Sequence, residues 1–163
     1  MDVTIFEKFD QACSEKLSAS IDEILRAGKE EKFCAISFMT TDDFYGCYLA
    51  WDYGNNIEAY YDWEQGSEPD FLYQPLVEIV DSCEEMDLCS KSEGKWEFAM
   101  CFLAVLEKNI RRIPDEIFRK NNYKREDVFF FATMSDGDYI EEMLDASAAM
   151  FNAAETRKTY GLL

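Results

Sequence analysis

The sequence predicts an α+β fold in which a mainly antiparallel sheet of about four strands packs against about four helices. Three observations favour this fold. Runs of aromatic and β-branched residues of strand length follow one another early in the chain, and segments with apolar residues three and four positions apart precede and follow them. No repeat, low-complexity tract or long linker divides the 163 residues. Residues 1–163 are therefore expected to form a single α+β domain, because a chain of this length buries enough surface for one core.

The first helix is expected near the N-terminus, where apolar residues recur mostly at steps of three and four with Lys, Glu and Asp between them. These apolar residues are Phe6, Phe9, Cys13, Leu17, Ile21, Ile24 and Leu25. Gly28 is placed to end the helix, because glycine is common just after a helix C-terminus.

Three antiparallel strands are expected next. Residues 32–40 and 44–51 are rich in aromatic and aliphatic side chains over strand length, and the polar residues 41–43 between them favour a hairpin turn. Residues 57–63 contain enough Tyr and Trp to predict a third strand. Residues 64–70, which include glycine, serine and proline, are expected to form a loop.

The second half of the chain predicts further helices around one strand. Pro75 suits the first turn of a helix, and residues 96–110 are apolar nearly all round, as in a buried helix. Pro114 stops that helix and opens a short one. Residues 128–133 are almost wholly apolar and are expected to form a central strand. Residues 140–151 show the pattern of a last amphipathic helix.

Charge is distributed unevenly along the chain. The net charge of −18 arises from 34 acidic and 16 basic residues, and residues 41–90 contain no Lys or Arg. The acids of this segment are Asp42, Asp43, Asp52, Glu58, Asp62, Glu64, Glu68, Asp70, Glu78, Asp81, Glu84, Glu85 and Asp87. Such a field repels nucleic acid and anionic membranes and speeds encounter with a cationic protein surface. An alternative is that the acids only keep the protein in solution.

Several classes of chemistry lack the residues they need. The chain has no histidine, the commonest general base and metal ligand, and no glycine-rich nucleotide-binding motif. We therefore expect no catalytic residue, cofactor or metal, and a binding protein rather than an enzyme. The six cysteines show no C-x-x-C spacing and are expected to be buried free thiols. The N-terminus lacks a signal-peptide pattern and no apolar run reaches membrane-spanning length, so a cytoplasmic location is expected.

Two acidic pairs leave a catalytic alternative open. Asp136 and Asp138 follow the strongest predicted strand, where carboxylates converge on Mg²⁺ or Ca²⁺ in many proteins. Asp138 also suits a helix N-cap. Asp42 and Asp43 fit either a general acid and base or the polar residues of a turn. A carboxylate-dependent metal hydrolase is thus the alternative function.

Aromatic residues alternate with the acids of residues 41–90, as in many protein interfaces, although strand alternation directs about half of such rings into the core. We predict that the acidic, aromatic-rich segment binds a partner protein. The predicted partner-binding residues are Asp42, Asp43, Asp52, Asp62, Trp63, Glu64, Glu68 and Asp70.

Two stretches resemble a bacterial family. Residues 35–48 contain Thr-Asp-Asp between two strands, and residues 128–138 read V-F-F-F-A-T-M-S-D-G-D, followed by a helix that ends in Phe151-Asn152. Together they resemble the domain of unknown function 4303 family, over most of the chain. The resemblance implies an immunity protein of a polymorphic or contact-dependent growth-inhibition system, which neutralises its toxin, and it identifies no catalytic residue. A nuclease toxin with a basic cleft would suit the negative charge; a general acidic adaptor is the alternative.

Overall fold

The computed structural model describes residues 3–162 and contains one four-stranded sheet in the order β3-β2-β1-β4. The strands are β1 (Cys34–Thr40), β2 (Cys47–Asp52), β3 (Gln65–Ser67) and β4 (Val128–Met134). β2 is antiparallel to both β1 and β3, whereas β4 is parallel to β1. The predicted α+β class with a mostly antiparallel sheet is confirmed.

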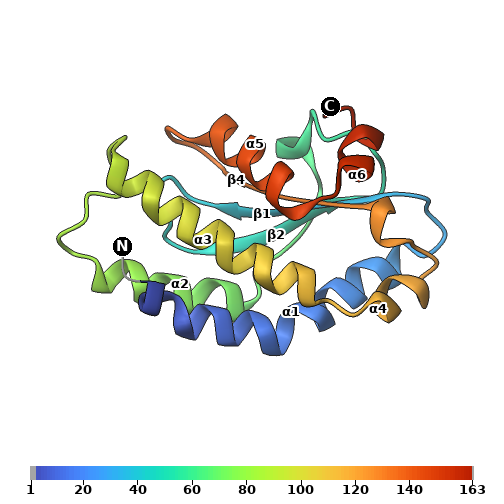
Figure 1. The fold of residues 1–163 in the computed structure, drawn as a ribbon, viewed down its shortest axis with the longest axis horizontal. Coiled ribbons are helices and arrows are strands. Elements are labelled where there is room, and N and C mark those ends of the chain that lie inside the picture. Colours follow the sequence, from blue (N-terminus) through green and yellow to red (C-terminus); the bar gives the residue numbers. More distant parts are fainter. Residues whose placement is uncertain (1–2, 163) are drawn as a thin grey trace.

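The four long helices are α1 (Glu7–Ala27), α2 (Asp70–Ser82), α3 (Glu93–Arg112) and α5 (Ile140–Phe151), and the two short α-helices are α4 (Asp115–Arg119) and α6 (Ala154–Thr159). The helices α1, α2 and α3 lie on one side of the sheet, while α5 and α6 lie on the other side, α5 along the β4 edge (Figure 1). Three 3-10 turns are η1 (Val3–Phe6), η2 (Tyr60–Asp62) and η3 (Arg125–Asp127). Within residues 3–162, no helix combines the length and the apolar character needed to cross a membrane.

Strand alternation divides the core into two layers. Ile36 and Phe38 of β1 face α1, α2 and α3, while Ala35 and Met39 face the opposite side. On the helical side, Phe9 of α1 stacks on Phe102 of α3 with ring centroids 5.7 Å apart. The helical layer contains most of the buried apolar side chains, as the amphipathic patterns of α1, α2 and α3 require.

The third strand lies later in the chain than predicted. Residues 57–63 form no strand but fold over the second face of the sheet through η2, where Tyr60 and Trp63 contact Phe131 at centroid distances of 5.5 and 5.8 Å. Covering this face buries more aromatic surface than an edge strand would. The strand β3 instead forms in the predicted loop, around Gly66.

The strand β4 is at the edge of the sheet rather than at its centre as predicted. It is apolar throughout because α5 covers its outer side. The Ser147 hydroxyl accepts from the Ala132 N–H at 2.8 Å and donates to the Ala132 carbonyl at 3.0 Å. The Asn152 side-chain amide does the same at Phe130: its Oδ1 accepts from the Phe130 N–H at 2.9 Å, and its Nδ2 donates to the Phe130 carbonyl at 2.6 Å. Two side chains thus take the place of a neighbouring strand.

Other element predictions were nearly right in position. Pro75 lies inside α2 rather than in its first turn, because the helix begins at Asp70 so that Phe71 and Leu72 enter the core. The helix α5 is capped by Tyr139 and not by Asp138. All six cysteines are free, but burial was predicted correctly only in part: Cys13, Cys34 and Cys47 are buried, Cys83 and Cys101 are half-buried, and Cys89 is exposed.

We predict that Ser147→Ala lowers the free energy of unfolding by about 2 kcal/mol, because it leaves the buried N–H and carbonyl of Ala132 without a partner. Urea unfolding measures this change. The control is Ala149→Ser, an exposed position of the same helix, where the change should stay within about 0.5 kcal/mol. Equal effects of both variants would contradict the proposed role of Ser147.

A buried carboxylate joins α1 to the segment after α4. The Asp22 carboxylate accepts from Lys120 Nζ at 2.9 Å, from Asn121 Nδ2 at 2.7 Å and from Arg26 Nη2 at 2.5 Å. Burial alone would raise the pKa of Asp22, but the hydrogen bonds from Lys120 and Asn121 and the positive charges of Arg26 and Lys120 outweigh it and hold this pKa below its ordinary value.

This lowered pKa gives a pH-dependent stability. A carboxyl with a lower pKa in the folded than in the unfolded chain stabilises the fold above the unfolded value of about 3.9, and the contribution is lost as pH falls through the folded pKa. We predict that Asp22→Asn costs about 2 kcal/mol at pH 7 and that the difference from the wild type narrows below pH of about 4. Urea unfolding from pH 3 to 7 tests this, with the exposed Glu23→Gln as control; a difference constant with pH would contradict it.

Candidate protein-binding surface

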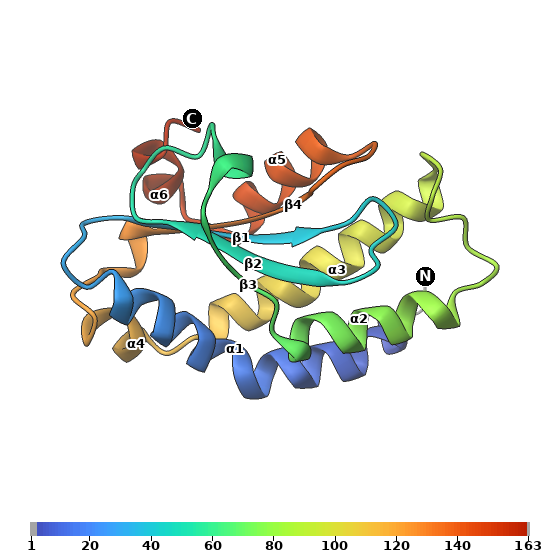
Figure 2. The same ribbon diagram turned by 180° about the vertical axis from the view of Figure 1, so that it is seen from behind.

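The acid-rich segment, residues 41–90, forms one side of the molecule. From the β1–β2 turn it continues through β2, passes over the sheet at η2, follows the sheet edge as β3 and returns beneath the sheet as α2. Figure 2 shows η2, β3 and α2 on the side turned toward the viewer. We call the surface formed by residues 41–90 the acidic side.

The carboxylates of the acidic side are largely exposed and without counterions. Asp42 and Asp43 are half-buried, and the other acids of the segment are exposed. Among the described residues 3–162, only two of them pair with a cation: Asp42 with Lys95 and Glu78 with Lys8. Internal arginines and lysines therefore do not neutralise this segment.

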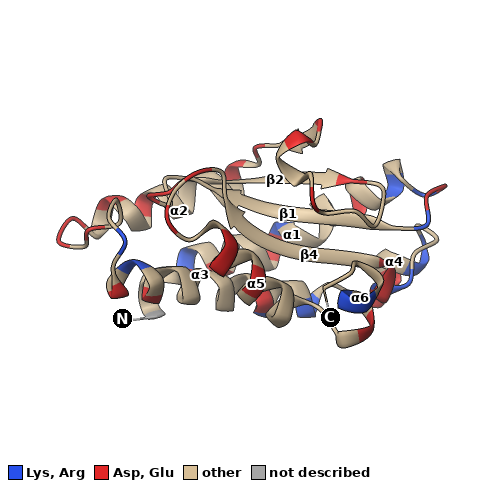
Figure 3. Ribbon diagram, turned by 90° about the horizontal axis from the view of Figure 1, so that it is seen from above, with Lys and Arg blue, Asp and Glu red and all other residues tan. Residues whose placement is uncertain are grey.

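Basic residues gather elsewhere in the molecule. Figure 3 shows some Lys and Arg along α3 and in the loop that follows α2, and a further group near α4 and α6 at the other end of the sheet. The residues of this further group are Arg119, Lys120, Lys124, Arg125, Arg157 and Lys158. The absence of Lys and Arg from residues 41–90 itself favours the approach of a cationic protein toward the acidic side.

The exposed aromatic residues lie on the acidic side as well. Tyr45, Tyr61 and Tyr73 have 43%, 70% and 42% of their surface exposed, and they are the large hydrophobic residues found exposed within residues 3–162. The ring of Tyr73 packs over Gly46, where an added Cβ would lie 2.5 Å from it. Since Gly46 has φ +111°, a side chain at this position is disfavoured by the backbone as well.

The predicted partner-binding residues fall into two groups. Glu64 and Glu68 flank β3 directly, and Asp62 and Asp70 lie just beyond them in η2 and at the start of α2. Ser67 pairs with Leu49 in the ladder between β2 and β3, which places the next residue, Glu68, near Tyr48. Burial raises the pKa of Tyr48, and the nearby Cys47, Glu68 and Asp136 raise it further. These four carboxylates are exposed and lie within nine consecutive residues that contain the edge strand.

The remaining predicted residues are more distant or more buried. Asp52 ends β2 and is exposed, whereas Asp42 and Asp43 lie in the hairpin turn at the other end of that strand. Asp43 accepts a hydrogen bond from the Thr41 hydroxyl, as the turn interpretation expected. Trp63 is half-buried against Phe131 and contributes mainly to holding η2 on the sheet.

A buried ion pair at the hairpin turn joins three separate segments. Lys95, in the first turn of α3, has a completely buried side chain, and its Nζ lies 2.5 Å from the Asp42 carboxylate and 3.8 Å from that of Asp138. The Asp42 carboxylate also accepts from the Asp138 backbone N–H at 3.1 Å. A Cβ at Gly137 would lie 1.8 Å from Asp42, so only glycine permits this approach.

The Thr-Asp-Asp and Ser-Asp-Gly-Asp stretches of the sequence therefore meet in space. Their acids bind a lysine that sequence reasoning missed, because a single Lys at the start of an apolar helix carries no pattern. The position that a cation would occupy between Asp42 and Asp138 is taken by the Lys95 ammonium group. Among the described residues, no group of three or more Cys, Asp or Glu side chains is arranged to hold a metal.

We predict that Asp42→Ala destabilises the fold by about 3 kcal/mol, because it leaves a buried ammonium group without its main partner. Lys95→Met should cost about 1 kcal/mol or less, since Met fills a similar volume and the half-buried Asp42 keeps access to water. Chemical denaturation of both variants measures the two changes. If Lys95→Met destabilises the fold more than Asp42→Ala does, the prediction is wrong and the Lys95 ammonium group itself makes a large net contribution to stability.

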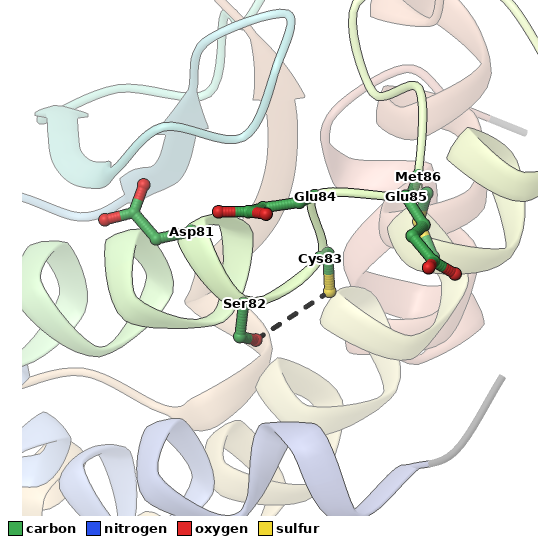
Figure 4. Close-up of a pocket in the computed structure, with 6 residues that line it drawn as sticks. All are labelled: Asp81, Ser82, Cys83, Glu84, Glu85 and Met86. Carbon is green, nitrogen blue, oxygen red and sulfur yellow. Dashed lines mark hydrogen bonds between the residues drawn. The ribbon is translucent and has the colours of Figure 1, made fainter.

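A hollow of the surface lies at the C-terminal end of α2 (Figure 4). Its volume is about 700 Å³, and the residues that line it are Asp81, Ser82, Cys83, Glu84, Glu85 and Met86. They belong to one continuous stretch of chain, and the only interaction drawn between them joins the Ser82 hydroxyl and the Cys83 thiol at 4.0 Å. The hollow is therefore part of the acidic side, and three of its six lining residues are carboxylates.

Searches of protein-family models, curated proteins and solved structures found no match to this chain. The resemblance to the domain of unknown function 4303 family remains a prediction from the two sequence stretches, and the functional argument depends on the surface itself.

Proposed function

We propose that this protein binds a positively charged partner protein through its acidic side and that the partner is a bacterial toxin domain, which it neutralises. The observation that carries the proposal is the set of exposed, uncompensated carboxylates from Asp62 to Asp70, bordered by the exposed rings of Tyr61 and Tyr73. The toxin as partner follows from the sequence resemblance, and the basic character of the partner follows from the charge.

The surface suits fast and selective capture. Uncompensated carboxylates speed diffusional encounter with a basic surface and disfavour acidic proteins, nucleic acids and anionic lipids. Tyrosines then supply contact area at a small entropic cost, because their side chains have few rotatable bonds. An inhibitor with these properties would cover the substrate cleft of a nuclease, which has to be basic to hold phosphate groups.

The test uses the toxin candidate encoded immediately upstream, expected to be the variable C-terminal domain of a large secreted protein. The variant Asp62→Lys, Glu64→Lys, Glu68→Lys should weaken binding at least about tenfold, mainly through slower association, and should flatten the dependence of affinity on salt. Asp70 is retained because an acid in the first turn of α2 stabilises that helix.

The matched control reverses three exposed acids outside the acidic side and outside the first turn of a helix, Glu23, Glu30 and Asp145. It changes the net charge equally, so it separates a local effect from a general one. Calorimetry and stopped-flow kinetics at two salt concentrations provide the measurements, together with protection of cells that express the toxin. Equal loss in both triple variants, or unchanged binding in the first, would refute the assignment of the acidic side.

A further inference from the structure

The two edges of the sheet are treated differently. The outer edge of β4 is occupied by the Ser147 and Asn152 side chains, which bond to its backbone. At the other edge, Gln65, Gly66 and Ser67 of β3 are all exposed. Within residues 3–162, their backbone forms no hydrogen bond outside the ladder with β2. Only the β3 edge therefore offers backbone donors and acceptors to another chain.

Building on the proposed function, we infer that the outer edge of β3 accepts an extended, Lys- or Arg-rich segment of the partner as an added strand. Addition of a strand to an exposed edge obtains its affinity from main-chain hydrogen bonds and its selectivity from the side chains alongside. Here the side chains alongside are the carboxylates of Asp62, Glu64, Glu68 and Asp70.

Charge decides between a basic segment and a second copy of this chain. Antiparallel pairing of two β3 strands about Gly66 would place Glu64 of one copy beside Glu68 of the other, and like charges directly opposite each other destabilise a sheet. The same carboxylates that prevent self-pairing and aggregation stabilise a strand with basic side chains. The absence of Lys and Arg from residues 41–90 leaves no internal competitor for these acids.

The exposed tyrosines lie in the elements that precede and follow this edge. Tyr61 belongs to η2, immediately before β3, and Tyr73 belongs to α2, immediately after it. Both rings are exposed in the segments that flank β3 in the chain, where a partner bound at this edge could reach them. With about 3.4 Å per residue, the three residues of β3 span about 10 Å, so the pairing is short and requires the flanking charges to be stable.

The experiment uses three synthetic nine-residue peptides with the intact protein. The first alternates Lys with Val or Thr, the second has the same side chains but esters in place of the internal amides, and the third has Glu in place of Lys. Binding is measured by calorimetry, and amide hydrogen exchange of Gln65, Gly66 and Ser67 is followed by NMR. The first peptide should bind about tenfold or more tightly than the ester analogue and should slow exchange within β3, and the third peptide should not bind.

The outcomes separate this inference from the proposed function. If the amide and ester peptides bind equally and exchange in β3 is unchanged, strand addition is wrong, although an electrostatic role of the acidic side survives. Absence of binding by the Lys peptide also overturns strand addition. The proposed function is then still tested separately, by measuring how the triple charge variant binds the upstream toxin domain. Slower amide hydrogen exchange only in regions outside β3 would likewise contradict strand addition at the β3 edge.

Discussion

The ion pair between Asp42 and the buried Lys95 organises one end of the molecule. It joins the β1–β2 turn, the first turn of α3 and the loop between β4 and α5, three segments that are far apart in the sequence. A buried ammonium group is tolerated only when carboxylates surround it. This requirement accounts for Asp42 and Asp138 together, and for Gly137, whose lack of a side chain lets the two loops approach. One acid from each of the two pairs considered for catalysis, Asp42 and Asp138, thus helps to hold the fold together.

The ion pair also affects how the acidic side is presented. Because it ties the hairpin turn to α3, the adjacent Tyr45 and Gly46 keep their position against Tyr73 of α2. Among the described residues, the carboxylates that remain along η2, β3 and α2 form no ion pair except Glu78, which pairs with Lys8 at the surface. Within residues 41–90, the half-buried Asp42 stabilises the fold through Lys95. The exposed carboxylates instead create a negative electrostatic field that extends into solvent.

The two edges of the sheet are protected in different ways, and only the β3 edge lies within the negative electrostatic field. Unpaired strand edges promote aggregation, and proteins protect them by covering them or by adding charge. Here α5 covers the β4 edge with two side chains, and the β3 edge is short and bordered by acids. The carboxylates beside β3 disfavour pairing with a second copy of this chain or with another acidic strand, but not with a basic strand. The protection of the β3 edge is therefore selective. This selectivity connects an ordinary feature of sheet design to the proposed recognition of a basic protein.

The sequence by itself determined the fold class, the hairpin of β1 and β2, the four long helices and the uncompensated charge of residues 41–90, because periodicity and composition are local properties. Tertiary structure alone decided that β4 lies at an edge, that residues 57–63 cover a face instead of forming a strand, and that Lys95 binds Asp42. An apolar strand looks the same in sequence whether a strand or a helix covers its edge. Similarly, aromatic residues occur both in strands and in segments that pack over a sheet. Residues 57–63 pack over the sheet because the face around Phe131 has to be covered by apolar side chains.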